Sequence, residues 1–295
     1  MGSAREAAVV LGRAGVRAVG MATADRRPLP DFLLIGTKRG GTTSLYFHLL
    51  RHPQVVPLFP RPEHLPKATF TKGVHYFDGE HHRGERWYRS HFPSHRVRDA
   101  AARAAGSPVV TGEASPYALF HPLAAERSAA LLPGVRLLAL LRDPVERTFS
   151  HWKERRRAGA EPLGFLDALA AEDDRVGAAE EALRTGTLRR SYAHEQQSYA
   201  RQSEYATSVC RWLEHHPAER LLVLTTEDYV RDPQSVVDEV SDHLGLRREL
   251  LPGAEALNGT AAADMPAAAR RRLQARFAPH NHELERVVGR TLPWS

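Results

Sequence analysis

The sequence predicts an α/β fold, in which a single domain is built on a central parallel sheet flanked by helices. Four short runs are almost continuous in Leu, Ile and Val, as is typical of parallel strands buried on both faces. Segments with helical patterns lie between these runs, and this alternation implies crossover connections. The first run also ends in a glycine-rich turn that leads directly into a helical segment.

The predicted elements follow in order along the chain. The apolar runs DFLLIG, PVVTG, VRLLALL and RLLVLT occupy residues 31–36, 108–112, 135–141 and 220–225. Hydrophobic periodicity predicts helices over residues 42–52, 121–133, 144–159, 202–217, 232–246 and 266–279. Pro144 suits the first turn of the third helix, where a missing amide donor costs nothing. Residues 158–190 are acidic and alanine-rich, which predicts surface helices, whereas residues 53–98 form a long excursion rich in Pro, His and aromatic side chains.

The chain has no internal repeat and no clear domain boundary, so residues 31–295 are predicted to form one domain. Residues 1–30 are basic and rich in Ala and Val, and we expect a flexible N-terminal arm there. They lack the continuous apolar stretch and the cleavage motif of a signal peptide. No run approaches the roughly 20 apolar residues of a membrane span. We therefore expect a cytoplasmic protein, and the richness in Ala and Arg is typical of a bacterial source.

Charge and cysteine content narrow the classes of function. The net charge of +6 and the isoelectric point near 9.7 favour an anionic ligand. The single cysteine, Cys210, excludes an internal disulfide and a multi-cysteine zinc site. The 16 histidines form no H-E-x-x-H motif, and adjacent histidines point in different directions on a regular element. We therefore expect no metal.

The glycine-rich turn is close to a triphosphate-binding loop but lacks its lysine. That loop reads G-x-x-x-x-G-K followed by Ser or Thr. Gly36 and Gly41 have the right spacing, but Thr42 stands at the lysine position, and Lys38 and Arg39 lie inside the loop. Backbone amides of the turn and the positive end of the next helix favour an anion, and without the lysine a short 5′-linked anion fits better than a metal-bound triphosphate. The alternative is a glycine-rich turn without a ligand.

A second signal follows the third apolar run, in the segment LLALLRDPVERTFSHW. Arg142 comes directly after the predicted strand, and Ser150 lies about two turns into the next helix. An arginine and a serine at such a place can share one phosphate, the arginine through a bidentate fork. The alternative is that Arg142 pairs with Asp143 or Glu146 on the surface.

Together the two segments resemble the phosphate-binding segments of sulfotransferases that use 3′-phosphoadenosine 5′-phosphosulfate, and the branch that includes the heparan sulfate sulfotransferases is the most similar. Further segments agree: KGVHYFD, RWYRSHFP, GEASPYALFHP, ERLLVLTTEDYVRDP and APHNHELERVVGRTLPW. The resemblance runs from about Asp31 to the C-terminus. It implies a P-loop-like sulfotransferase fold, metal-free sulfuryl transfer and 3′-phosphoadenosine 5′-phosphate as the product.

The resemblance also implies the residues that bind the donor. Arg142 and Ser150 match the binders of the 3′-phosphate. The turn matches the cradle of the 5′-phosphosulfate, and its residues are Lys38, Arg39, Gly40, Gly41, Thr42, Thr43 and Ser44. Arg39 stands where relatives commonly carry a catalytic lysine. It can stabilise charge but donates a proton poorly, so Lys38 is a second candidate for that role.

The general base is less clear, because this chain departs from its relatives there. Many relatives read K-E-x-H-F-F, and the glutamate taken as their base is replaced here by Gly73. His75 is the first substitute, since the ordinary pKa of histidine suits a base, and Glu113 is the second. A structural histidine beside Tyr76 is the alternative for His75. Two further departures are Ala114, where relatives often carry lysine, and the segment 258–266, which lacks their basic residues.

Two other functions remain open at this stage. A kinase that uses ATP on a P-loop-like site is the first, and the missing lysine argues against it. A non-catalytic nucleotide-binding or polyanion-binding protein is the second, motivated by the charge and the lost glutamate. For the sulfotransferase, we expect a saccharide or secondary-metabolite acceptor that offers a hydroxyl or an amine. We expect neither a nucleic-acid nor a membrane partner, and the sequence leaves the oligomeric state open.

Overall fold

The computed structural model describes residues 15–60, 72–251 and 265–295. Within them a parallel four-stranded sheet has the order β2-β1-β3-β4. The strands are β1 (Phe32–Gly36), β2 (Gly112–Ala114), β3 (Arg136–Leu141) and β4 (Leu221–Thr225). The predicted α/β class with a central parallel sheet is therefore confirmed, and the apolar runs form β1, β3 and β4 as expected.

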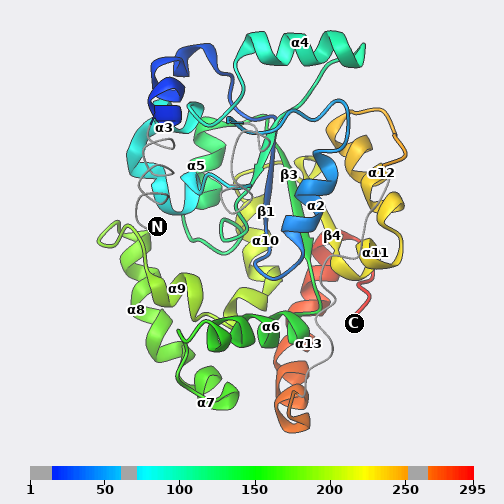
Figure 1. The fold of residues 1–295 in the computed structure, drawn as a ribbon. Helices are drawn as coiled ribbons and strands as arrows, with labels where there is room; N and C mark the ends of the chain where they lie inside the picture. Colours follow the sequence, from blue (N-terminus) through cyan, green and yellow to red (C-terminus); the bar gives the residue numbers. More distant parts are fainter. Residues whose placement is uncertain (1–14, 61–71, 252–264) are drawn as a thin grey trace, which may run out of the picture.

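The helices of the described residues cover both faces of the sheet (Figure 1). They are α2 (Thr42–Leu49), α3 (Gly84–Arg89), α4 (His95–Ala105), α5 (Ala124–Leu131), α6 (Pro144–Arg157), α7 (Phe165–Ala170), α8 (Glu172–Arg184), α9 (Tyr192–Gln196), α10 (Tyr205–Leu213), α11 (Thr226–Arg231), α12 (Pro233–Leu244) and α13 (Ala267–Val288). Short helical turns are η1 (Ala24–Arg26), η4 (Tyr76–Glu80), η5 (His81–Arg83), η6 (Arg201–Ser203) and η7 (Ala218–Arg220). The surface helices predicted for residues 158–190 are α7 and α8.

Alternate residues of the strands pack into two cores, one on each face of the sheet, because successive side chains of a strand point to opposite faces. Phe32 and Leu34 of β1 pack with Tyr46 of α2 and Val240 of α12. On the other face, Leu33 and Ile35 pack with α5, α10 and α13, where Trp212 is fully buried. Two-sided burial explains why the strands read as continuous apolar runs.

The second strand does not lie where the sequence predicts it. The run over 108–112 ends where β2 begins, at Gly112, which pairs with Phe32. Upstream, Val110 makes only an isolated bridge to Val55. The carboxylate of Asp31 accepts a hydrogen bond from the Thr111 amide at 2.7 Å, and this side chain occupies the donor that a strand neighbour would otherwise use. Pairing partners, rather than apolar content, set this boundary.

The last helix also extends further than expected, to Val288 rather than residue 279. Pro279 lies inside α13, where it removes one backbone donor. Phe277 and Leu284, on either side of the proline, are fully buried, and α13 packs along α10. The free energy of burying these side chains outweighs the local cost of the proline, which is about 3 kcal/mol in a helix interior.

Part of the segment assigned to the N-terminal arm is described, and it packs on the rest of the chain. Residues 15–22 are helical, and Ala24 is fully buried. The side chain of Arg89 on α3 donates to the Arg27 carbonyl at 3.0 Å. Residues 1–14 lie outside the described residues, as do 61–71 of the long excursion and 252–264 of the late segment.

Candidate active site

The turn after β1 is held by backbone hydrogen bonds at the carboxyl ends of neighbouring strands. The Thr37 amide donates to the Leu140 carbonyl at 2.8 Å, and the Gly40 amide donates to the Thr37 carbonyl at 3.0 Å. A Cβ atom at Gly40 would lie 2.7 Å from the Leu140 oxygen, so only glycine fits there. The Thr226 hydroxyl donates to the Gly40 carbonyl at 2.7 Å and to the Leu141 carbonyl at 2.8 Å, which ties the turn to β3 and β4.

The turn passes directly into the N-terminus of α2. Gly41 has φ of 83° and precedes the first helical residue, Thr42. The first amides of a helix have no acceptor within the helix, so the amides of Thr42, Thr43 and Ser44 are available to an anion. Thr42 is buried. The predicted cradle therefore has the geometry of an anion site.

A lysine that the sequence did not single out reaches this cradle. Lys72 donates from Nζ to the Thr42 hydroxyl at 2.9 Å. Burial of the ammonium, and then repulsion from the Lys38 ammonium, lower the pKa of Lys72 to about 8. Thr42 is the residue at the position of the triphosphate-loop lysine, so a cation from a distant segment lies where the loop itself lacks one. The only sequence signal was the place of Lys72 at the start of KGVHYFD.

Lys38 is directed to α9. Its Nζ donates to the Gln196 side-chain oxygen at 2.9 Å and forms an ion pair of 3.2 Å with Oε1 of Glu195. Burial lowers the pKa of Lys38, and the Glu195 carboxylate opposes that shift. The lysine therefore links the turn to α9.

Arg142 and Ser150, the residues predicted to bind the 3′-phosphate, each contact Arg39, which was predicted for the 5′ side. Arg39 donates from Nε to the Ser150 hydroxyl at 3.2 Å, and Arg142 donates from Nη1 to the Arg39 carbonyl at 3.4 Å. The Asp143 carboxylate caps α6 by accepting from the Val145 amide at 2.8 Å. Within the described residues Arg142 forms no ion pair with Asp143 or with Glu146, which instead pairs with an arginine of α13.

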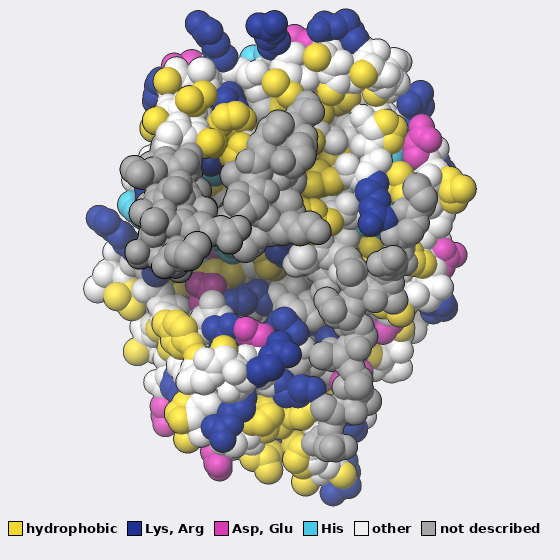
Figure 2. Space-filling view, viewed as in Figure 1, with side chains coloured by type: hydrophobic (Ala, Val, Ile, Leu, Met, Phe, Trp, Pro, Cys, Tyr) yellow, Lys and Arg dark blue, Asp and Glu magenta, His cyan; other side chains and the backbone are white. Residues whose placement is uncertain are grey.

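A fully buried arginine lies one turn before Ser150 on α6. Arg147 is 0% exposed and donates from Nη2 to Nδ1 of His151 at 2.6 Å. Its Nε and Nη1 atoms make no hydrogen bond within the described parts of the chain. Burial lowers the pKa of Arg147 to about 10, so it stays charged at neutral pH, and the Arg39 and Arg142 guanidiniums act in the same direction. Figure 2 shows further Lys and Arg side chains gathered over α6, so this side of the cradle is strongly positive.

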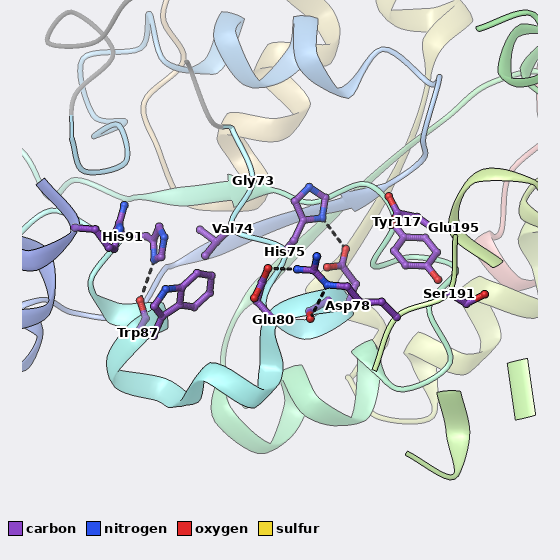
Figure 3. Close-up of a pocket in the computed structure, with 13 residues that line it drawn as sticks. Gly73, Val74, His75, Asp78, Glu80, Trp87, His91, Tyr117, Ser191 and Glu195 are labelled. Carbon is purple, nitrogen blue, oxygen red and sulfur yellow. Dashed lines mark hydrogen bonds and ion pairs between the residues drawn. The ribbon is translucent and has the colours of Figure 1, made fainter. Parts of the chain in front are cut away.

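His75 and Asp78 line a cavity of about 380 Å³ that also contacts Glu195. His75 Nδ1 lies 2.9 Å from Oδ2 of Asp78, and the histidine side chain is 46% exposed while the aspartate is buried. Burial of the imidazole disfavours its charged form, but the Asp78 carboxylate, with weaker help from Glu113 and Glu195, outweighs this and raises the pKa of His75 to about 9. Figure 3 shows the pair between Trp87 and His91 on one side and Tyr117 and Glu195 on the other.

Glu113, the second candidate base, is committed to holding the His75 segment. Its Oε2 accepts from the Val74 amide at 2.5 Å and from the Ser115 hydroxyl at 2.6 Å, and its Oε1 accepts from the Tyr88 hydroxyl at 2.9 Å. The side chain is 1% exposed, and burial raises its pKa. Glu113 therefore lies beneath the cavity, where it positions its neighbours.

The packing around residue 73 explains why this chain has glycine there and not the glutamate of its relatives. A Cβ atom there would lie 2.4 Å from the Ala114 carbonyl oxygen and 2.9 Å from the Ser115 hydroxyl. The backbone of β2 thus occupies the space that a side chain needs.

The described residues contain no group of three or more His, Cys, Asp or Glu side chains arranged to hold a metal. No helix among them has the length and apolarity of a membrane span.

Comparisons with known proteins agree with this geometry. A family model described as a sulfotransferase domain matches residues 29–258. The human bifunctional heparan sulfate N-deacetylase/N-sulfotransferase 1 is 30% identical over 230 residues, which are 76% of this chain and 23% of that protein. The Drosophila melanogaster bifunctional heparan sulfate N-deacetylase/N-sulfotransferase is 28% identical over 230 residues, or 74% of this chain and 20% of its own. This chain therefore spans less than a quarter of their length. The crystal structure of a sulfotransferase from Alicyclobacillus acidocaldarius superposes with a TM-score of 0.65 at 27% identity, covering 90% of this chain and 98% of that one.

Proposed function

Because this chain belongs to the sulfotransferase domain family, we propose that it transfers a sulfuryl group from 3′-phosphoadenosine 5′-phosphosulfate to a hydroxyl or amine of a saccharide or secondary metabolite. The observation that supports the donor assignment is that cationic side chains lie at two separate places along one turn. Arg39, Arg142 and Ser150 meet at one. Lys72 meets Thr42 at the other. A donor with a separate phosphate on each side of its ribose suits such a pair.

The residues of the cradle fit this donor. Gly40 leaves the backbone open where any Cβ would intrude, and the amides at the start of α2 favour the 5′ side. The cluster of Arg39, Arg142 and Ser150 would hold the 3′-phosphate, the arginines by charge-assisted hydrogen bonds. Within the described residues Arg147 makes no hydrogen bond to a carboxylate. Its positive charge lies near Arg39 and Arg142 and favours an anion there.

The same residues divide the chemical work. When bound, the donor supplies an activated sulfuryl group and departs as 3′-phosphoadenosine 5′-phosphate. Lys72 and the first amides of α2 would stabilise the negative charge that grows on the 5′-phosphate, which lowers the barrier because that charge is larger in the transition state. In the neutral form of His75, which predominates only above its pKa of about 9, Asp78 holds the proton on Nδ1, and Nε2 would accept the acceptor's proton.

The acceptor class is proposed from the relatives. The curated relatives are heparan sulfate N-sulfotransferases by name, which supports a saccharide. The cavity at His75 is of a size to hold one or two rings and has an aromatic wall at Trp87, so an aromatic metabolite also suits it.

The test is transfer of radiolabelled sulfate from the donor to a panel of amino sugars, hydroxylated sugars and phenols. We expect transfer to at least one acceptor class and binding of 3′-phosphoadenosine 5′-phosphate in calorimetry. Arg142→Met should weaken that binding by about 1.5–3 kcal/mol, as for loss of a charge-assisted hydrogen bond. Arg103→Met, an exposed change on α4, is the matched control and should have no effect.

Two outcomes would contradict the proposal. Tight, magnesium-dependent binding and turnover of ATP would favour a kinase. Binding of 3′-phosphoadenosine 5′-phosphate without transfer to any acceptor would favour a nucleotide-binding protein without catalysis.

A further inference from the structure

The cavity at His75 has a wall that comes from outside the region matched by the family model. That region begins at residue 29, whereas Arg17 lines the cavity. The segment that carries Arg17 docks closely on α3. A Cβ atom at Gly20 would lie 2.6 Å from the Ser90 carbonyl oxygen, and Arg86 donates to the Met21 carbonyl at 3.1 Å. Contacts this close fix the segment that carries Arg17 against α3.

Arg17 carries a charge that no carboxylate of the described residues neutralises. Its Nη1 donates to the Ser90 carbonyl at 2.8 Å and to the Ser90 hydroxyl at 2.9 Å. Burial, and then the nearby Arg27 guanidinium, lower the pKa of Arg17 to about 10, so it remains a cation at neutral pH. Arg27 likewise donates to the Phe92 carbonyl and the Thr23 hydroxyl and lies over the Phe59 ring, so among the described residues it contacts no carboxylate.

The acidic side chains of the cavity, by contrast, are all engaged. Asp78 pairs with His75, and Glu195 pairs with Lys38. Glu80 pairs with both Arg83 and Arg190. Of the two arginines that line this cavity, Arg190 pairs with Glu80, whereas Arg17 pairs with no carboxylate of the described residues.

The side chains beside Arg17 suit a ring. Trp87 and His91 line the same part of the cavity (Figure 3). His91 must donate from Nδ1 to the Trp87 carbonyl, 2.9 Å away, because a carbonyl only accepts. Burial and the nearby Arg17 lower the pKa of His91 to about 3, so the ring is neutral and its Nε2 is a hydrogen-bond acceptor. An indole face, a neutral acceptor and a cation thus lie together on the side of His75 away from Tyr117 and Glu195.

We propose that Arg17 is a specificity-determining residue, which binds an anionic group of the acceptor while a ring of that acceptor packs on Trp87 and its hydroxyl or amine lies at His75. The proposal rests on the proposed function, since it concerns the acceptor of that reaction. The acceptor class it names is a ring compound that carries a carboxylate or another anion, and neutral analogues of the same shape are disfavoured.

The test compares two probes that differ only at one group, 4-nitrophenyl β-D-glucuronide and 4-nitrophenyl β-D-glucoside. Their affinities for the full chain are measured by saturation-transfer NMR in the presence of 3′-phosphoadenosine 5′-phosphate. We expect the wild type to bind the glucuronide about 10-fold to 100-fold more tightly, as for one charge-assisted hydrogen bond. Arg17→Met should bring this ratio to near one. Arg26→Met, which changes an exposed arginine of the same segment, should keep it.

A second variant separates a local from a global effect. Gly20→Leu forces the segment away from Ser90 and should also abolish the preference, while the affinity for 3′-phosphoadenosine 5′-phosphate stays close to that of the wild type. Equal affinities of the wild type for both probes, including failure of both to bind at millimolar concentration, would overturn the proposal. So would an unchanged ratio in Arg17→Met. Failure of the proposed function is a different result, namely loss of nucleotide binding or of sulfate transfer by the wild type.

Discussion

Replacing Lys72 with methionine tests whether a cation from outside the turn serves the 5′ side of the donor. The change keeps most of the side-chain volume and removes the ammonium that lies 2.9 Å from the Thr42 hydroxyl. A hydrogen bond from a charged donor is worth about 1.5–3 kcal/mol, so the affinity for 3′-phosphoadenosine 5′-phosphate should fall by about 10-fold to 150-fold. The affinity for adenosine 3′-monophosphate should not change, because that ligand has no 5′-phosphate.

The pH dependence of the affinity for 3′-phosphoadenosine 5′-phosphate is a second, independent test of the role of Lys72. The pKa of Lys72 is about 8 in the free protein, and a bound anion favours the charged form, so binding raises that pKa. Below pH 8 the lysine is already protonated and the affinity is level. As the pH rises through 8, the free protein loses the proton that the complex keeps, and the affinity falls by up to about tenfold per pH unit. Proton uptake on binding, measured by calorimetry in buffers of different ionisation enthalpy, should appear above pH 8 in the wild type.

The reasoning fails if the methionine variant binds both nucleotides as the wild type does. It also fails if the variant weakens both equally, because that result would mean a general disturbance of the site. A wild-type affinity for the bisphosphate that stays level between pH 7 and pH 10 would contradict the placement of Lys72 beside the 5′-phosphate.

Three further predictions follow from the same geometry. The transfer rate should rise with pH and level off above about 9, since neutral His75 is the base and its pKa is about 9, and Asp78→Asn should move this rise to lower pH; a profile that is flat from pH 6 to pH 9 would contradict it. Gly40→Ala should destabilise the protein by about 1–3 kcal/mol, as overpacking does, and thermal melts should show this with and without nucleotide; an unchanged melting temperature would count against the fit of the turn. Arg147→Met should leave the free energy of unfolding of the free protein unchanged or higher, because it removes a buried charge with no hydrogen-bonded carboxylate. The same change should reduce the rise in melting temperature that the nucleotide produces. A loss of several kcal/mol in the free protein would mean that this charge is compensated.

Local patterns predicted the scaffold. β1, β3 and β4 are apolar on both faces, and the helices after β1 and β3 begin at Thr42 and at Pro144 as their sequences indicate. The local pattern also placed Arg142 at the end of β3 and Ser150 on α6, as the structure has them. The boundary of β2 and the length of α13 were not predictable, since each depends on a neighbour that lies far away in the sequence.

The remaining site residues depend on contacts between distant segments. Lys72 meets Thr42 across 30 residues, and Lys38 meets Glu195 across 157. Glu113 looked like a candidate base because it follows a strand, and only its contacts with Val74, Ser115 and Tyr88 reveal that both its oxygens are occupied. Sequence patterns report which side chains exist near a strand end, but the direction in which each one points is set by tertiary packing.

The ion pair between Lys38 and Glu195 connects the glycine-rich turn with the cavity at His75. The lysine lies on the glycine-rich turn after β1, and the glutamate lines the cavity at His75. An anion that binds the Lys38 ammonium weakens the ion pair with Glu195. A ligand that binds the Glu195 carboxylate weakens the same ion pair. By thermodynamic reciprocity each substrate then changes the affinity for the other by the same factor. The signature of this shared link would be that each ligand changes the dissociation constant of the other by the same factor.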